Sequence, residues 1–248
     1  MKIWAIADLH LSFGVPSKTM EAFGEAWKNY GARIEENWKK LIHKDDLVLI
    51  AGDISWAIKW EDALVDLRWI DSLPGIKVML KGNHDYWWSS LKKMQKDLPS
   101  SLHLIQNNSF TINGITIGGS RLWDTSEYSF EEYIDYVPNP LVNEKEKNIQ
   151  EELGDDIFKR ELVRLRLSLE TLDPKAHTRI AMTHYPPIGP DMKDSAVSKI
   201  LEEFGIQYVV FGHLHNLKKG TKLFGEKNGV QYLFTAADYL KFVPIQII

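Results

Sequence analysis

The sequence predicts an α/β fold. Short apolar runs that suit buried strands alternate with amphipathic segments whose apolar residues recur every three or four positions. This alternation occurs in both halves of the chain, and turn residues such as Pro74-Gly75 and Asp173-Pro174 separate the segments. Strands that alternate with helices are typical of α/β domains. Because α/β folds of this length are routinely single units, we expect one domain over residues 1–248.

In the first half, three apolar runs predict buried strands, and three segments with helical spacing predict helices. The strands are expected at residues 3–7, 47–51 and 76–80, and the helices at 17–43, 60–73 and 89–98. The first of these helices contains Gly24 and Gly31, which weaken it, and Gly31 marks a place for a kink or a break.

In the second half, β structure comes first. Residues 102–105, 110–112 and 115–118 are expected to be strands, and Asn113-Gly114 predicts a hairpin between the last two. The segment that follows is acidic and aromatic and contains Pro138 and Pro140, so we expect an insertion or lid near residues 124–156. The predicted domain is completed by helices at 156–172 and 195–204 and by strands at 180–183, 208–211, 230–236 and 242–248.

The composition excludes several kinds of chemistry. The chain contains no Cys, so disulfides, thiolate zinc sites and a Cys nucleophile are excluded. The net charge is -4, so there is no overall basic bias toward nucleic acid or an anionic membrane, although a local basic patch stays open. The nearest basic cluster, which contains Lys218, Lys219 and Lys222, is also what a solvated turn would contain.

The N-terminal segment does not resemble a signal peptide. Its apolar run is interrupted by Asp8 and then by His10, too early for the apolar region of such a peptide. No stretch approaches the roughly 18 apolar residues that a membrane helix needs. These features predict a cytoplasmic protein with no membrane partner, and the sequence gives no indication of an oligomeric state.

Residues with metal-ligand chemistry follow five of the predicted strands. The five blocks are Asp8-Leu9-His10, Gly52-Asp53, Gly82-Asn83-His84-Asp85, His184-Tyr185-Pro186-Pro187 and Gly212-His213-Leu214-His215. In open α/β sheets, ligand sites gather just beyond the carboxyl ends of strands. Five of the eight histidines lie in these blocks, whereas His43, His103 and His177 lie outside them and are interpreted as surface or hydrogen-bonded residues. The convergence predicts one site.

The spacing within the blocks has a physical interpretation. Asp8 and His10 are two residues apart, as are His213 and His215, and in extended chain such pairs project from one face. Each pair is therefore expected to reach one ion or two neighbouring ions. A glycine before three of the blocks allows a sharp turn and a close approach to an ion. Mixed His, Asp and Asn ligands without sulfur favour Mn, Fe, Zn, Co or Ni over Ca or Mg.

Together, in this order from Asp8 to His215, the five blocks resemble the calcineurin-like metallophosphoesterase superfamily, in particular its bacterial phosphohydrolases. The resemblance implies a four-layer sandwich of two mixed β-sheets flanked by helices. It also implies a cofactor of two divalent metal ions, for which we expect Mn, with Fe, Zn, Co or Ni as alternatives. By this resemblance, the first ion is bound by Asp8, His10, Asp53 and His215, and the second by Asp53, Asn83, His184 and His213. Asp53 would bridge both ions.

The resemblance also implies a mechanism of phosphoester hydrolysis. Two metals about 3.5–4 Å apart share a hydroxide and clamp a phosphate group. A metal-bound water can have its pKa lowered to around 7, so that hydroxide is available at neutral pH. His84 follows Asn83 directly, and we expect it to protonate the leaving group or to bind a phosphate oxygen.

Two departures argue against the protein Ser/Thr phosphatase branch. In that branch the Gly-Asp block continues into an Asp and an Arg, and here neither follows Asp53. Trp56 stands where that branch has the Asp that orients its histidine, and Asp85 stands where it has Glu. Asp85 either orients His84 or holds the loop, and the sequence leaves both open.

The surroundings of the blocks bear on the substrate. Aromatic side chains adjoin them, and these either stack on a nucleobase or sugar or pack beneath the loops. They are Trp56, Tyr86, Trp87, Trp88, Trp123 and Tyr185. Arg121 also follows a strand and either binds phosphate or forms a salt bridge.

We therefore expect a small phosphorylated substrate, either a monoester or a diester. A nuclease is the first alternative, but it predicts a basic track beside the site that the sequence does not show. A non-catalytic scaffold is the second alternative. The complete set of ligands together with His84 argues against it, because a scaffold has no physical need for them.

Overall fold

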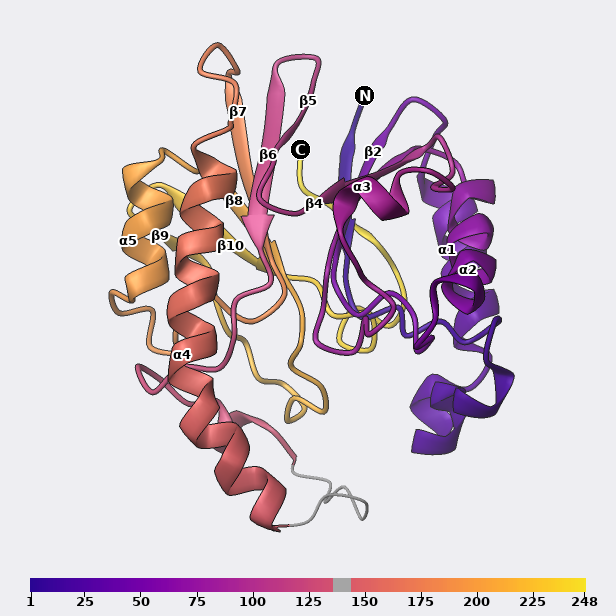
Figure 1. Cartoon of the computed structure of the whole chain (residues 1–248), viewed down its shortest axis with the longest axis horizontal. Coiled ribbons are helices and arrows are strands. Elements are labelled where there is room, and N and C mark those ends of the chain that lie inside the picture. The colour runs from indigo at the N-terminus through magenta and orange to yellow at the C-terminus, as the bar shows by residue number, and fades with distance from the viewer. Residues whose placement is uncertain (136–143) are drawn as a thin grey trace.

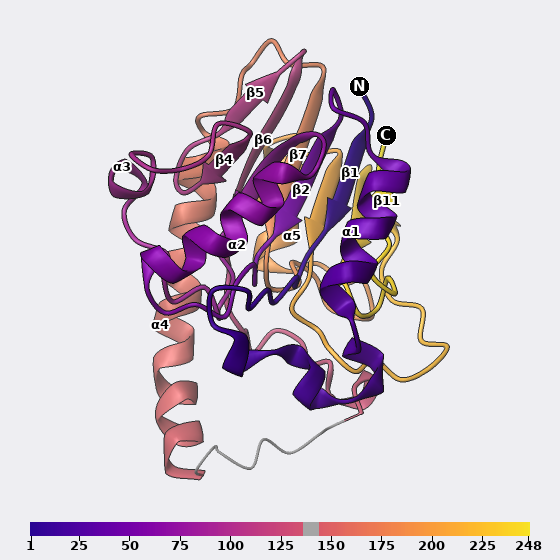
Figure 2. The ribbon, with the colours of Figure 1, turned by 90° about the vertical axis from the view of Figure 1, so that its right-hand side faces the viewer.

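The chain folds into two β-sheets that pack face to face and carry helices on both outer faces (Figures 1 and 2). The structure is a computed structural model that describes residues 1–135 and 144–248. The strand order is β11-β1-β2-β3-β4 in one sheet and β5-β6-β7-β8-β10-β9 in the other. Both sheets are mixed. This arrangement confirms the predicted α/β sandwich.

The five-stranded sheet is parallel except at one edge. Its parallel strands are β1 (Ile3–Ile6), β2 (Leu47–Ala51), β3 (Ile76–Leu80) and β4 (Leu102–Ile105), and β11 (Ile245–Gln246) pairs antiparallel with β1. Layers on both faces bury these strands, which is why they occur in the sequence as continuous apolar runs.

The six-stranded sheet has antiparallel strands at both edges. Its parallel centre consists of β6 (Ile115–Ser120), β7 (Thr178–Thr183), β8 (Tyr208–Phe211) and β10 (Val230–Phe234), and its edges are β5 (Phe110–Ile112) and β9 (Glu226–Lys227). The predicted hairpin at Asn113-Gly114 is confirmed, since both residues have the positive φ that a tight hairpin turn requires.

Each sheet has its own helices. On the outer face of the five-stranded sheet lie α1 (Tyr30–Leu41) and α2 (Trp60–Ser72), with the short α3 (Leu91–Met94) near β4 (Figure 1). The six-stranded sheet carries α4 (Glu144–Leu169) and α5 (Ala196–Glu203). Within the described part of the chain, no helix combines the length and apolar character needed to cross a bilayer.

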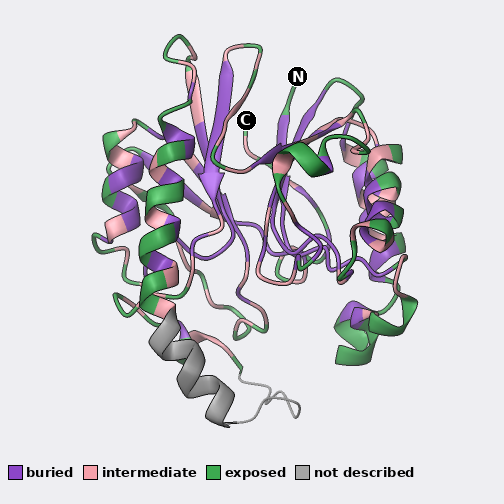
Figure 3. Ribbon diagram, viewed as in Figure 1, coloured by how far each residue is buried: buried purple, intermediate pink, exposed green. Residues whose placement is uncertain are grey.

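Alternate residues of the strands pack into different parts of the core, because successive side chains of a strand point to opposite faces. Ile3, Ala5 and Leu49 face the gap between the sheets, where they join Ile117 and Met182 of the other sheet in one buried cluster. The alternate residues of β1 and β2 instead face α1 and α2. Figure 3 shows the consequence, because the buried residues form a band through both sheets and the exposed residues lie on the outer faces of the helices.

The predicted helix over residues 17–43 is wrong in its first half. That part forms three short 3-10 helices, η1 (Pro16–Lys18), η2 (Met20–Phe23) and η3 (Glu25–Trp27), and α1 begins only at Tyr30. Gly24 has φ +115° and Asn29 has φ 51°, so both residues leave the right-handed helical region. The apolar residues of this segment are nevertheless buried, as their spacing predicted for Met20, Trp27 and Tyr30.

Other boundaries also differ from the prediction. The helix expected at 89–98 is limited to α3, and the strand expected at 242–248 is limited to β11, since Lys241 and Phe242 have positive φ. The helix expected at 156–172 begins much earlier, at Glu144, so α4 and the 3-10 helix η4 (Glu131–Tyr133) occupy part of the predicted insertion. Residues 136–143 of that insertion lie outside the described residues. The insertion itself stays a prediction.

Lys77 on β3 makes the free energy of unfolding change with pH in the alkaline range. Its side chain is fully buried, and its ammonium donates to the carbonyl oxygens of Asp71 and Leu73 at the end of α2. Burial lowers the pKa of Lys77 from 10.5 to about 8, although Asp71 acts in the opposite direction. Between these two values the unfolded chain holds a proton that the folded chain has released, so the free energy of unfolding rises with pH in this interval.

We therefore expect the stability of the wild type, measured against Lys77→Met, to improve between pH 8 and pH 10.5. Urea unfolding of both proteins at several pH values measures this difference. The difference in free energy of unfolding between the two proteins reports the titration of Lys77, because all other titratable groups are present in both chains. A difference that does not change with pH would contradict the assignment.

Candidate metal centre

The five predicted blocks follow β1, β2, β3, β7 and β8, and the structure brings their polar side chains together at one edge of the sandwich. Because the carboxyl ends of these parallel strands meet at this edge, residues up to 205 positions apart in the chain come into contact. The residues of this cluster are Asp8, His10, Asp53, Asn83, His184, His213 and His215.

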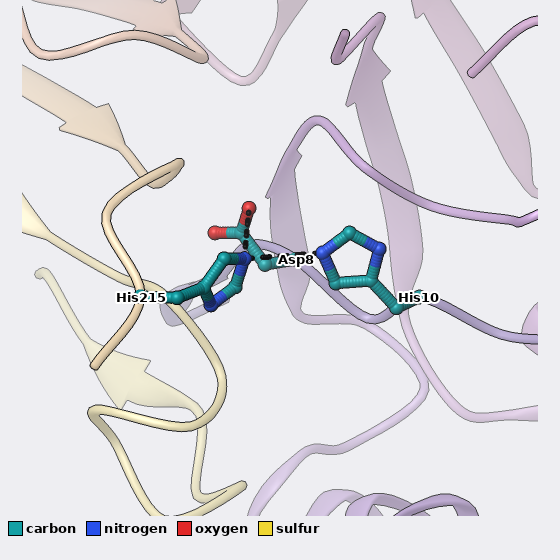
Figure 4. A group of neighbouring side chains, drawn as sticks. All are labelled: Asp8, His10 and His215. Atoms are coloured by element: carbon teal, nitrogen blue, oxygen red, sulfur yellow. Dashed lines mark hydrogen bonds and ion pairs between the residues drawn. The ribbon is translucent and has the colours of Figure 1, made fainter. Parts of the chain in front are cut away.

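One part of the cluster consists of Asp8, His10 and His215 (Figure 4). Their ligand atoms all lie within 4.8 Å of one another. The Nε2 atoms of His10 and His215 are 3.1 Å apart, and His215 Nε2 lies 3.7 Å from Asp8 Oδ1. The two rings point toward each other beside Asp8, as Figure 4 shows. Three donor atoms this close offer a binding place for one cation.

Asp53 connects this part of the cluster to His184. Its Oδ2 atom lies 3.6 Å from His10 Nε2 and 3.4 Å from His184 Nε2. The ligand atoms of Asp8, Asp53 and His184 also lie within 4.8 Å of one another. One carboxylate oxygen of Asp53 therefore lies within reach of His10, in the first part of the cluster, and of His184, in the second part, which also contains Asn83 and His213.

The hydrogen bonds of His184 show that the donor set fits a cation. His184 Nδ1 is 2.9 Å from the carbonyl oxygen of Ala51, so this nitrogen carries a proton. Its Nε2 faces Asn83 Oδ1 at 2.7 Å, and His213 Nδ1 lies 3.1 Å from the same oxygen. Lone pairs that converge in this way repel one another unless a proton or a cation lies among them. A divalent ion suits this mixed nitrogen and oxygen set.

Burial and mutual charge shift the pKa values in the cluster in opposite directions. Burial raises the pKa of Asp8 to about 7. Burial alone would lower the pKa values of His184 and His215, but the carboxylates beside them raise both to about 9. Burial alone would raise the pKa of Asp53, but His184 and His10 lower it well below 3.8. A divalent ion would therefore displace protons from the two histidines as it binds.

The extended-chain interpretation of the Asp8 and His10 pair is wrong. Asp8 has φ 58° and His10 has φ 45°, and Asp53 and His213 also have positive φ, at 51° and 74°. Such left-handed residues cost of order 1–3 kcal/mol each and persist where the surroundings hold them. Here the backbone N–H of Asp8 donates to Gly52 O, and the N–H of His10 donates to Asp53 O, both at 2.9 Å.

Gly82 and Gly212 make room for the carboxylates of the cluster. A Cβ atom on Gly212 would overlap the carboxylate of Asp8, and one on Gly82 would overlap the carboxylate and backbone nitrogen of Asp53. The sequence interpretation, in which glycine lets the chain approach an ion, stays a prediction. These two glycines let the chain approach the side chains of Asp8 and Asp53.

His84 lies beside the cluster. Its backbone N–H donates to Asp53 Oδ1 at 2.8 Å, and its ring lies 5.7 Å from the ring of His10. The half-buried ring packs against Trp56, with 4.5 Å between the centroids, and burial lowers the pKa of His84. Trp56 also stacks on His10 at 4.9 Å. Trp56 therefore positions His84 by packing, where the protein phosphatase branch is expected to use an Asp.

The contacts of Asp85 decide between its two predicted roles. Its carboxylate accepts the backbone N–H groups of Ile54 and Ser55, and that of Gly82 at 2.7 Å. It also accepts the indole N–H of Trp87 at 3.1 Å. Asp85 therefore holds the loop after β2 against the loop after β3.

Asp238 is a residue that the sequence interpretation missed. Its Oδ1 lies 3.1 Å from His215 Nδ1, and its side chain is 14% exposed. A carboxylate on the far ring nitrogen fixes the tautomer of a metal-binding histidine and makes it a better ligand. Asp238 comes four residues after β10, and this strand-end position was the signal that could have identified it.

We expect Asp238→Asn to weaken metal binding by about 10–100-fold, because partners of this kind contribute that much to metal affinity. Isothermal titration of the metal-free variant with Mn²⁺ measures the change. Asp191→Asn, which alters an exposed carboxylate, is the control. An affinity equal to that of the wild type would exclude this role for Asp238.

Three of the six aromatic residues near the site pack beneath the loops. Trp87, Trp88 and Tyr185 are each less than 9% exposed, and Tyr185 packs on the ring of His213. Tyr86 is 61% exposed. The packing interpretation therefore holds for the three buried residues, and only Tyr86 presents a largely free ring. Arg121 forms a salt bridge, to Glu161 at 3.8 Å.

Part of this chain is similar in sequence to two phage proteins. The chain is 32% identical over 84 residues to the Gene 66 protein of Mycobacterium phage L5 and 32% over 83 residues to that of phage D29. These matches cover 33% and 34% of this chain and 39% and 40% of the phage proteins, so the chain matches about two fifths of their length.

Two solved structures are similar to this chain at 15% identity, and the first named here shares its fold. Phosphopantetheinyl hydrolase (PptH) from Mycobacterium tuberculosis has a TM-score of 0.57, with 100% of this chain and 95% of that chain covered. AQ665, a protein of unknown function from Aquifex aeolicus, has a TM-score of 0.47, with 99% and 95% covered. The model of the calcineurin-like phosphoesterase family matches residues 1–217, which include all five blocks. The chain therefore belongs to the calcineurin-like phosphoesterase family.

Proposed function

We propose that this protein hydrolyses a small phosphoester at a centre of two divalent metal ions, with His84 as the general acid. The observation that carries the proposal is the contact among seven potential ligands delivered by five strand ends. Membership of a phosphoesterase family supports metal-dependent hydrolysis of phosphoesters in general. The cytoplasmic location stays a prediction from the sequence.

The ligand sets follow the two parts of the cluster. Asp8, His10, Asp53 and His215 would hold one ion, and Asp53, Asn83, His184 and His213 would hold the other. Asp53 would be shared, which the position of its Oδ2 between His10 and His184 supports. We propose Mn as the metal, and the donor set also suits Fe, Zn, Co or Ni. When bound, the ions supply Lewis acidity toward the phosphoryl oxygens and lower the pKa of water at the site.

The residues of the chain perform the remaining tasks. His84 would give its proton to the leaving oxygen, and its half-buried ring lies next to the ligand His10. Trp56 fixes the plane of that ring by packing, and Asp85 fixes the loop that carries it. A fixed ring is needed because general acid catalysis requires hydrogen-bond contact with the leaving oxygen.

The proposal is tested by stripping the protein of metal and following its hydrolysis of bis-p-nitrophenyl phosphate and p-nitrophenyl phosphate as single metals are added back. We expect turnover that depends on added metal, with Mn²⁺ among the activating ions. The ratio of diester to monoester turnover then assigns the substrate type. No turnover with any of Mn²⁺, Co²⁺, Ni²⁺, Zn²⁺ or Fe²⁺ would contradict the proposed function.

A further inference from the structure

A cavity lies beside the metal centre. Its volume is ≈ 460 Å³, within the range of roughly 300–1,000 Å³ that is usual for small-molecule sites. The ends of β3, β4 and β6 form its walls, and α4 contributes one side. The charged residues that line it are Lys81, Arg121, Arg160, Glu161 and Arg164.

The charge of this cavity is opposite to that of the whole protein. Four cationic side chains and one carboxylate line it, a local balance of +3 in a chain whose net charge is -4. Cations that share one cavity repel one another, and the repulsion grows as water is excluded. An anion in the cavity would relieve this repulsion.

The single carboxylate cannot pair with all the cations. Glu161 is buried and accepts hydrogen bonds from Arg164 at 2.6 Å and from Ser120 Oγ at 2.7 Å, while Arg121 lies 3.8 Å away. Among the side chains of residues 1–135 and 154–248, Lys81 Nζ has no hydrogen-bond or ion-pair partner, and the buried Nε of Arg121 has no hydrogen-bond partner. The guanidinium of Arg121 also lies over the ring of Trp123 at 4.5 Å, which holds its plane in place.

The backbone connects the cavity directly to the metal centre. Lys81 is two residues before Asn83, so their Cα atoms are at most about 7 Å apart. The carbonyl oxygen of Arg121 accepts the N–H of His184 at 3.1 Å and that of Tyr185 at 3.0 Å. A molecule held at the metals by one group therefore has a cationic cavity next to it.

We propose that this cavity binds a second phosphate group of the substrate, so that the substrate class is a phosphoester with two separate phosphate groups. This inference rests on the proposed function. Arg121 and Arg164 supply planar donors that match phosphate oxygens in pairs, and Lys81 supplies a charge with no ion-pair partner among the side chains of residues 1–135 and 154–248.

Competition with bis-p-nitrophenyl phosphate tests the inference on the metal-loaded protein. Adenosine 3′,5′-bisphosphate and AMP differ only in the second phosphate. Charge-assisted hydrogen bonds contribute about 1.5–3 kcal/mol each, so the bisphosphate is expected to inhibit at least about tenfold more strongly than AMP. Lys81→Met and Arg164→Ala should each reduce this ratio toward one. Arg166→Ala, which removes an exposed arginine of α4 that pairs with Glu203, should leave the ratio unchanged.

Binding of inorganic pyrophosphate to the metal-free protein separates the two proposals. Isothermal titration should show binding that Lys81→Met and Arg164→Ala weaken at least about tenfold, and that Arg166→Ala preserves. If this pattern appears in a protein that hydrolyses no ester, the anion site stands and the proposed function fails. Two results would overturn the inference. One is equal inhibition by AMP and the bisphosphate, and the other is pyrophosphate binding that neither Lys81→Met nor Arg164→Ala weakens.

Discussion

Replacing Asp53 by asparagine is expected to reduce kcat/KM on the order of 10³-fold or more, because bound ions stabilise the charge of the transition state by several kcal/mol and each 1.36 kcal/mol is tenfold in rate. Asp53 is the carboxylate that lies within reach of both His10 and His184. Asparagine keeps the shape of the side chain but removes its charge. The variant is therefore also expected to bind fewer than two ions. Steady-state kinetics and metal analysis of the same preparation measure both effects.

Asp46→Asn is the matched control for this experiment. Asp46 is also buried, and its carboxylate accepts hydrogen bonds from the backbone N–H groups of Lys2 and His43. It precedes β2, at the opposite edge of the sheet from the metal centre, so its loss should lower the melting temperature and leave kcat unchanged. An Asp53→Asn protein that keeps two ions and more than a tenth of wild-type turnover would be incompatible with a shared Asp53.

Replacing His84 by alanine is expected to lower kcat by about 10²–10⁴-fold, the usual contribution of a general acid. The loss should depend on the leaving group. A p-nitrophenolate leaves without protonation, whereas an alkoxide needs a proton, so the larger effect is expected for an alkyl phosphoester. Turnover of p-nitrophenyl and alkyl esters by wild type and variant measures this dependence.

The control for His84 is His103→Ala, since the ring of His103 stacks on Phe110 away from the cluster. Both substrates should be turned over at the wild-type rate by this variant. If His84→Ala slows the two classes of ester equally, His84 positions the substrate or the loop and is not the proton donor.

The strands and the convergence of the site were predictable from the sequence because burial on both faces leaves a strong signal. β2, β3, β4 and β8 match the predicted ranges, since apolar runs such as that of Leu47–Ala51 end where the chain leaves the buried layer. The same burial places the ligand blocks, because a parallel strand delivers whatever follows it to the carboxyl edge of the sheet.

Local backbone conformation was not predictable in the same way. The apolar spacing of residues 17–27 is compatible with a helix, and only Gly24 and Asn29, both at positive φ, decide that the segment folds as 3-10 turns. The left-handed conformations of Asp8 and His10 depend on hydrogen bonds to the loop after β2, which is more than 40 residues away. Asp238 follows β10 as the ligand blocks follow their strands, but its contact with His215, 23 residues away, comes from the folded structure.

The most direct measurement is an anomalous diffraction map of Mn²⁺-loaded crystals, recorded on both sides of the manganese absorption edge. We expect two manganese peaks about 3.5–4 Å apart on either side of Asp53, one next to His10 and His215 and the other next to His184 and His213. A single peak, or peaks away from these residues, would contradict the two-metal centre.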